Sequence, residues 1–195
     1  MPMRQFADRP TIRNIIPIEE LSLSERKEAK KNALQYGFDR AKVRGMAASP
    51  NELVVRAPRC RADFGTAAEG WFTAALAVLN NAYSVFQAVP TFAVANNNII
   101  VWYGAACLTP TIAGGLPISL LTIGQGAAPG TTYAVFNMED LTAYQIVAGY
   151  FSEPIVFEPT EVMNITVTCK VVTGIAAIVP LYGYILEPRG PVVSG

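Results

Sequence analysis

The C-terminal stretch AAIVPLYGYIL, residues 176–186, has apolar side chains at almost every position. Successive side chains of a β-strand point to opposite faces, so this stretch would be apolar on both faces of a sheet. Pro180 has no backbone N–H and restricts such a strand to a sheet edge or a bulge. An apolar edge strand promotes aggregation unless something covers it. We therefore expect another segment or another subunit to cover this strand.

The composition agrees with extensive burial between protein molecules. The chain of 195 residues is 51% hydrophobic and only 15% charged, with a mean hydropathy of +0.30. Charged residues usually make up about 25% of a soluble domain. We therefore predict a homo-oligomer. The residues predicted at its interface, with the same or another protein, are Val179, Leu181, Tyr182, Tyr184 and Leu186.

A transmembrane helix would be a different explanation for this composition, but it requires about 20 consecutive apolar residues. The best stretch, residues 71–94, is interrupted by Asn80, Asn81, Gln87 and Pro90. The first ten residues lack the apolar core of a signal peptide. We expect no transmembrane segment and assembly inside a cell.

The net charge of the chain changes sign near Phe64. Residues 1–64 contain thirteen Lys or Arg and eight Asp or Glu, a balance of +5. Residues 65–195 contain two basic and seven acidic residues, a balance of −5. We predict a charged N-terminal arm over residues 1–64 and a β domain over residues 65–195.

The arm contains one predicted helix, at about residues 23–44. Ser22 and Glu25 form a capping-box pattern, and Gly45 follows the last turn. The helix has a thin apolar stripe, so it needs a surface on which to pack. Its predicted contact residues are Arg26, Lys30, Lys31, Arg40 and Arg44. Interleaved acidic residues would repel phosphate, so we favour a protein partner over nucleic acid, which stays the second candidate.

The remainder of the chain indicates strands separated by Gly- and Pro-rich turns. Asn96, Asn97 and Asn98 between two apolar runs predict a β-hairpin, because Asn tolerates positive φ. Residues 66–90 fit either helix or strand, because alanines favour the first and aromatic residues and valines the second. The fold class that we predict is mainly β: an antiparallel, jelly-roll-like β-sandwich with an extended, partly helical N-terminal arm.

No pattern in the chain predicts catalysis. Histidine is absent, which removes the commonest general base and most zinc sites. Cys60, Cys107 and Cys169 are far apart and form no metal or redox motif. The acidic residues do not form a convincing acid and base pair. We expect no enzymatic activity, no catalytic residues, no metal and no cofactor.

One resemblance extends these inferences. The stretch from Tyr144 to Arg189 combines an aromatic strand, a Pro-rich corner, a Thr/Val-alternating strand and the terminal PLYGYILEP strand. In this pattern it resembles the C-terminal half of jelly-roll or β-sandwich structural proteins of bacteriophage virions, including capsid and head-decoration (cement) proteins. The resemblance implies a virion component that is assembled in the host cytoplasm and contacts itself and other capsid proteins.

Two functions follow as hypotheses. The first is a non-enzymatic structural protein that forms or stabilises a phage capsid through contacts between subunits. The alternative is a β-sandwich binding module for carbohydrate or a host surface, such as a receptor-binding or fibre component. That module would stack sugars on Trp71, Trp102, Tyr103 or Tyr150. The exposure of these aromatic side chains distinguishes the two.

Overall fold

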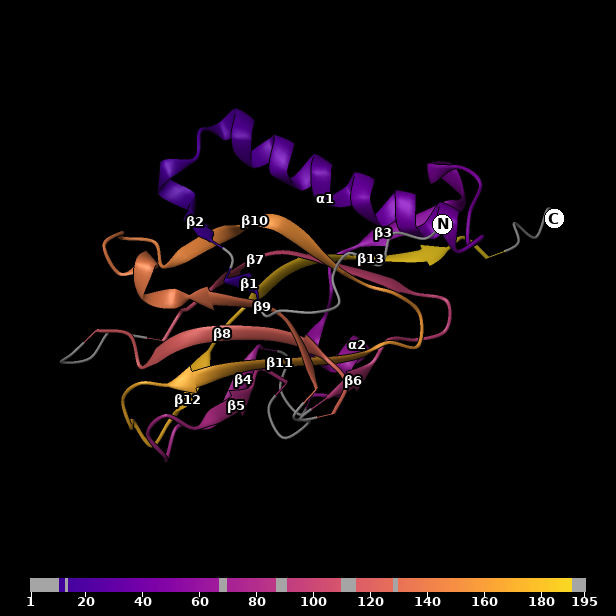
Figure 1. The fold of residues 1–195 in the computed structure, drawn as a ribbon. Coiled ribbons are helices and arrows are strands. Elements are labelled where there is room, and N and C mark those ends of the chain that lie inside the picture. Colours follow the sequence, from indigo (N-terminus) through magenta and orange to yellow (C-terminus); the bar gives the residue numbers. More distant parts are fainter. Residues whose placement is uncertain are drawn as a thin grey trace.

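Three layers form the protein: a long helix, a sheet beneath it, and a second sheet beneath the first (Figure 1). The computed structural model describes residues 11–12, 14–66, 70–86, 91–109, 115–127 and 130–190. Among the described strands, one short pair is parallel and the other pairs are antiparallel. The predicted mainly β, antiparallel sandwich is confirmed, and its jelly-roll connectivity stays a prediction.

The two large sheets have the following strands in spatial order. The lower sheet contains β1 (Thr11–Ile12), β9 (Thr131–Asn137), β8 (Ile118–Gln125), β11 (Val162–Cys169) and β5 (Ala82–Ser84), with β6 (Phe92–Ala93) also paired to β11. The upper sheet contains β2 (Ile15–Pro17), β10 (Ala148–Phe157), β7 (Ile99–Ala106), β13 (Leu181–Pro188) and β3 (Leu53–Arg56). A small third sheet pairs β12 (Ala176–Ile178) with β4 (Phe72–Ala75). Short helices complete the fold at α2 (Cys60–Phe64) and in the 3-10 turns Ile18–Glu20, Pro50–Glu52 and Met138–Leu141.

The main core lies between the two large sheets. The inward residues of β11 alternate with half-buried ones, as expected for a strand with one apolar face. The fully buried Trp102 donates its indole N–H to Met163 Sδ at 3.4 Å, which connects the two sheets. Phe64 of α2 packs among the aromatic residues of this core, with its ring centroid 4.8 Å from that of Phe92 and 5.1 Å from that of Phe86. The short helix α2 therefore contributes a side chain to the core between the sheets.

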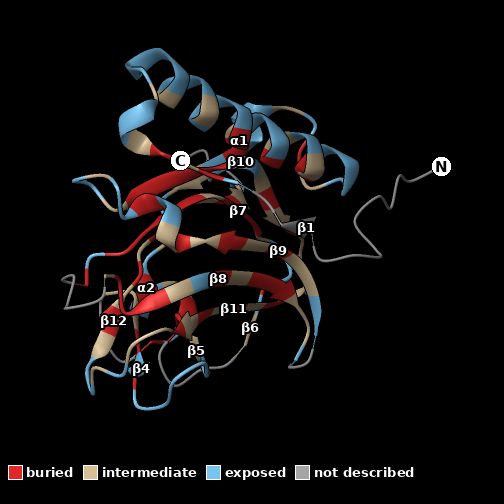
Figure 2. Ribbon diagram, turned by 60° about the vertical axis from the view of Figure 1, so that its left-hand side comes forward, coloured by how far each residue is buried: buried red, intermediate tan, exposed pale blue. Residues whose placement is uncertain are grey.

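Helix α1 (Leu23–Val43) covers the outer face of the upper sheet and confirms the predicted helix to within one residue. Both bonds of the capping box form: Glu25 N–H donates to Ser22 Oγ, and Ser22 N–H donates to Glu25 Oε2 at 2.7 Å. The outward side of α1 is exposed, whereas its sheet side is buried (Figure 2). The buried helix residues are all small: Ala33, Gly37 and Ala41.

A second core forms where α1 meets the upper sheet. It consists of Ala33 and Ala41 of the helix together with Ala47, Leu53, Ile99, Val101 and Leu186. A Cβ added at Gly37 would lie 2.9 Å from both Leu186 methyls and 3.0 Å from Val101 Cγ2, so the helix backbone approaches the sheet closely. The outer face of β13 is thus covered by α1 of the same chain. Since β13 lies between β7 and β3, it is not an edge strand, and Pro180 lies just before it, where the chain leaves the small sheet.

The described part of the expected arm is built into the sandwich. Strands β2 and β3, from the first 64 residues, are the two outer strands of the upper sheet. Strand β1 pairs with β9 of the lower sheet only three residues before β2 begins in the upper one. Residues 14–64 therefore pack on residues 70–190 rather than extending from them.

The structure overturns one local expectation, the Asn-rich hairpin, and decides another, the conformation of residues 66–90. The predicted hairpin around the three asparagines is wrong, because β6 pairs with β11 in the lower sheet whereas β7 lies in the upper one. The Asn-rich turn thus carries the chain between the sheets. The described part of residues 66–90 contains the strands β4 and β5, which settles that segment as strand over residues 72–75 and 82–84.

An ion-pair network joins α2 to the edge of the upper sheet. Arg56 contacts Asp63 at 2.7 Å and Glu187 at 2.5 Å, and Asp63 also accepts the Arg59 N–H at 2.6 Å. Burial alone would raise the pKa of Asp63, but the hydrogen bonds from Arg56 and Arg59 outweigh it and lower the pKa below its ordinary value.

Replacing Asp63→Asn should therefore flatten the acid dependence of stability. A lowered pKa in the folded state means that the stabilisation is complete above the unfolded pKa of about 3.9 and is lost as the pH falls through the folded value. At neutral pH we expect a free energy of unfolding lower by about 1–3 kcal/mol, measured by urea denaturation. Below about pH 3 the difference from the wild type should shrink. The control is Asp39→Asn on the exposed side of α1; an equal effect there would refute the role of the network.

Replacing Gly37→Leu distinguishes a packed helix from a free one. In a solvent-exposed helix Leu is favoured over Gly by up to about 1 kcal/mol, so stability would rise. Against Leu186 and Val101 the added side chain overpacks the contact, and we expect a loss of about 1–3 kcal/mol in urea denaturation. Asn32→Leu, at an exposed position of α1, is the matched control and should be neutral or stabilising. Stabilisation by both substitutions would show that α1 does not rest on the sheet.

Candidate functional site

The predicted interface residues of the C-terminal strand lie inside the folded chain. Val179, Leu181 and Leu186 are at most 4% exposed. Tyr182 and Tyr184 are half-buried on the face that α1 covers, and they form a cluster with Tyr103 and Tyr150 whose ring centroids lie 5.2–6.3 Å apart. Burial raises the pKa of Tyr103 and of Tyr182, so these phenols stay neutral. The strand buries one face in the core between the two sheets and the other against α1 of its own chain.

The basic residues of α1 separate into two groups. Arg40 and Arg44 reach Glu158 in the turn between β10 and β11, so part of the expected acidic partner lies in the same chain. Arg26 donates to the Leu21 carbonyl at 2.9 Å. Lys30 and Lys31 are exposed and make no ion pair with any residue that the structure describes. These two lysines are the part of the predicted arm contact that is still available to another molecule.

The aromatic residues of the alternative hypothesis do not form an exposed platform. Trp102 is fully buried and Tyr150 is 4% exposed. Trp71 packs against Phe64, with centroids 5.4 Å apart, and Tyr103 is half-buried within the tyrosine cluster. None of the four residues therefore presents a fully exposed ring on which a sugar could stack.

The ends of β4, β5 and β12 lie on the side of the molecule away from α1 (Figures 1 and 2). Exposed apolar side chains on the segments that connect these strands are here called the apolar end. It is formed by Val78, Leu79, Val172 and Ile175, each 51–56% exposed. The first two residues lie in the turn between β4 and β5, and the other two in the loop before β12. Leu76 joins the two segments, because its N–H donates to the Ile175 carbonyl at 2.9 Å and its own carbonyl accepts the Thr173 N–H at 3.1 Å.

Charged residues are missing from the sequence around the apolar end. Neither residues 70–138 nor residues 171–186 contain Asp, Glu, Lys or Arg. The neighbouring Lys170 is paired with Glu139 at 2.7 Å. The amino-acid sequence left residues 66–90, which include Val78 and Leu79, as either helix or strand, and it marked neither segment as an interaction surface. The signal that could have identified them is the presence of Val, Leu and Ile where turns usually carry Gly, Asn, Asp or Ser.

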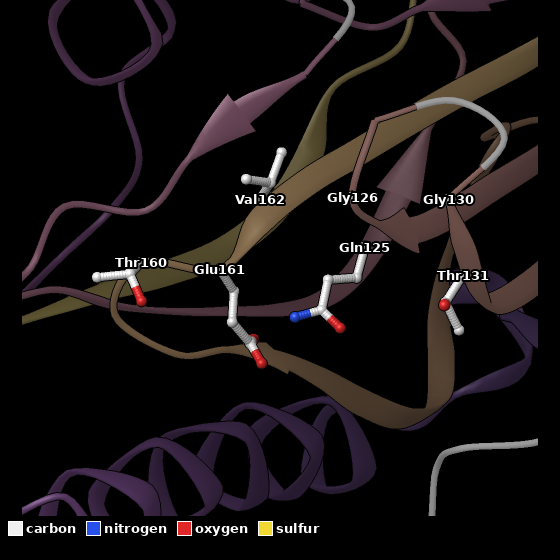
Figure 3. Close-up of a pocket in the computed structure, with 7 residues that line it drawn as sticks. All are labelled: Gln125, Gly126, Gly130, Thr131, Thr160, Glu161 and Val162. Carbon is white, nitrogen blue, oxygen red and sulfur yellow. The ribbon is translucent and has the colours of Figure 1, made fainter.

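A polar pocket of about 630 Å³ lies at another edge of the sandwich (Figure 3). It is lined by Gln125, Gly126, Gly130, Thr131, Thr160, Glu161 and Val162. These residues come from the turn between β8 and β9 and from the turn between β10 and β11. The two turns are joined where Gly126 N–H donates to the Val162 carbonyl at 2.8 Å.

A chain of hydrogen bonds orients the polar groups of this pocket. Tyr133 O–H donates to Gln125 Oε1, the Gln125 side chain is hydrogen-bonded to Glu161, and Glu158 N–H donates to Glu161 Oε2 at 2.8 Å. Burial raises the pKa of Glu161, while Arg44, Arg40 and Gln125 partly oppose that shift. Burial and the nearby Glu161 raise the pKa of Tyr133 to about 12. The arrangement suits hydrogen bonding to a ligand.

Neither a metal centre nor a family relationship adds to this description. Over the described ranges, no three His, Cys, Asp or Glu side chains come together as a metal site. No helix in the same ranges is both long and apolar enough to cross a bilayer. Comparisons of the chain with protein families, with curated protein sequences and with solved structures find no match.

Thr160 has a strained backbone at the rim of the pocket. Its φ of 69° lies in the left-handed region, which β-branched residues rarely adopt. The turn is held there by Thr160 N–H, which donates to the Val94 carbonyl at 3.0 Å, and by Val94 N–H, which donates to the Glu161 carbonyl at 2.8 Å. Such strain costs about 1–3 kcal/mol and persists where the surroundings determine the conformation.

Replacing Thr160→Gly should relieve this strain and raise the free energy of unfolding by about 1 kcal/mol, after the entropic cost of glycine is subtracted. Thr168→Gly, in the regular strand β11, is the matched control and should lower stability by about 1 kcal/mol. Urea denaturation of both variants measures the difference. Equal losses in the two variants would show that residue 160 does not hold a left-handed conformation.

Proposed function

We propose that this protein is a non-enzymatic structural protein that assembles with further copies of itself, and that the assembly is part of a bacteriophage virion. The observation that carries the proposal is the apolar end. Four large apolar side chains, each about half exposed, lie on two segments that are hydrogen-bonded to each other and carry no charged residue from 70 to 138 or from 171 to 186. Exposed apolar clusters of this kind mark interaction sites.

The absence of charge on the apolar end favours a second copy as the partner. A charged patch repels its own copy, whereas an uncharged apolar patch is compatible with itself across a two-fold axis. The desolvation cost of such a contact is small because the four side chains that form the apolar end carry no charge. The partner surface can thus be provided by the chain itself, with other capsid proteins as further neighbours.

The virion assignment rests on the resemblance of residues 144–189 to phage structural proteins. A sandwich with a charged helix on one side and an apolar end on the other suits a subunit that contacts unlike neighbours on its different sides. Lys30 and Lys31, which are unpaired among the described residues, provide a second contact surface that is charged rather than apolar. Protein stays the favoured partner for that helix, since Glu25, Glu28 and Asp39 alternate with its basic residues.

The test is the mass of the native particle, measured by light scattering and electron microscopy. We expect a multiple of the 21.0 kDa chain mass. Leu79→Asp should weaken association by at least about 100-fold, because a buried unpaired carboxylate costs several kcal/mol. The side chain of Leu79 is 54% exposed, so the fold should tolerate the substitution.

Val43→Asp is the matched control, since Val43 is 77% exposed and lies on α1, away from the apolar end. This variant should keep the wild-type mass. Circular dichroism of each variant verifies folding. A wild-type protein that stays monomeric at high concentration, or a Leu79→Asp variant with unchanged mass, would refute assembly through the apolar end.

A further inference from the structure

We propose that the polar pocket between the β8–β9 turn and the β10–β11 turn is a binding site for the hydroxyl groups of a neutral saccharide. The site differs from the aromatic platform expected from the sequence, because none of the described residues that line it is aromatic. It also differs from the apolar end, which consists of other turns. Its recognition chemistry follows from the donors, acceptors and charges that surround the pocket.

The walls of the pocket are held in place by backbone hydrogen bonds. Gly126 and Thr160, one on each turn, have φ values of 90° and 69°, and each donates its backbone N–H across to a neighbouring segment. The Glu161 backbone N–H donates back to the Glu158 carbonyl at 3.1 Å, which closes the second turn. The hydrogen bonds that hold Gly126 and Thr160 in place reduce the entropy cost of binding a small ligand beside them.

The side chains offer hydrogen-bonding positions that no residue of the described ranges uses. An ionised carboxylate can accept about four hydrogen bonds. Glu161 is hydrogen-bonded to Gln125 and accepts one bond from the Glu158 N–H, so further positions stay open toward the pocket. Figure 3 shows the Gln125 amide and the Glu161 carboxylate next to each other, with Thr131 and Thr160 on either side. Hydroxyls of a sugar can both donate to the carboxylate and accept from the amide or the threonines.

The charge around the pocket favours a neutral ligand. Glu158 and Glu161 carry two negative charges, and Arg40 and Arg44 of α1 carry two positive charges beside them. The two arginines bind Glu158 and also lie close enough to Glu161 to lower its pKa against the effect of burial. An ammonium ligand would therefore meet a carboxylate that already has positive neighbours. An anionic ligand would meet that carboxylate directly and be repelled.

The experiment uses saturation-transfer difference NMR on the full chain, which works for a monomer and for a large assembly alike. The neutral probes are maltose, lactose and sucrose. Glucosamine and glucuronate provide the same ring with a positive or a negative charge. We expect saturation transfer to at least one neutral disaccharide at millimolar concentration, and weaker transfer to both charged sugars.

Two variants locate the site. Glu161→Gln replaces a charged acceptor with a neutral amide of similar shape and should lower the affinity by about tenfold. Thr131→Val removes only an exposed hydroxyl and should lower it by a few fold. Glu28→Gln on the exposed side of α1 is the control and should bind as the wild type does.

Absence of transfer to every neutral probe, or transfer that Glu161→Gln leaves unchanged, would overturn the proposal. Binding of glucosamine alone that depends on Glu161 would also overturn it, since the pocket would then be an amine site. The Leu79→Asp variant separates this inference from the assembly: retained sugar binding by a dissociated chain would show that the pocket acts without the contact between subunits.

Discussion

The close contact between α1 and the upper sheet determines the rest of the architecture. Gly37 lets the helix backbone approach the methyl groups of Leu186 and Val101, and the small residues one turn on either side continue that approach. Without this layer, the outer face of β7 and β13 would expose a second apolar core to water. The helix also brings Arg40 and Arg44 to Glu158 and thereby supports one wall of the polar pocket. A single packing contact thus links the cover of the sheet to the charge balance of the candidate binding site.

Local patterns in the sequence predicted the parts of the fold that local interactions determine. The capping box at Ser22 and the glycine after the last turn gave the limits of α1, because both are satisfied within a few residues of the chain. The alternation of apolar and polar residues in β11 identified the face that points into the core, because this pattern too depends only on residues close together in the chain. The requirement that the C-terminal strand be covered on both faces was also correct. What could not be read from the sequence was which segment covers it, since that contact joins residues far apart in the chain.

The polar pocket could not be predicted from the sequence for the same reason, because it too joins residues far apart in the chain. The pocket combines residues near 125–131 with residues near 160, and nothing in either segment indicates that they meet. The opposite net charges of the two parts of the chain suggested contacts between subunits. In the structure, the pairs of Arg44 with Glu158 and of Arg56 with Glu187 use that complementarity within one chain. Net charge by segment therefore identifies complementary surfaces but does not tell whether they belong to one molecule or two.

The placement of the apolar end opposite the charged helix has a consequence for any layer that these molecules form. Each molecule has two unlike sides: a charged, solvent-exposed side at α1 and the apolar end around Leu79 and Ile175. Two copies that contact each other through their apolar ends have their α1 helices on opposite outer sides of the pair. Copies that bind an apolar surface of another protein through their apolar ends all have α1 on the same side. The first arrangement has two identical sides, and the second has an inside and an outside.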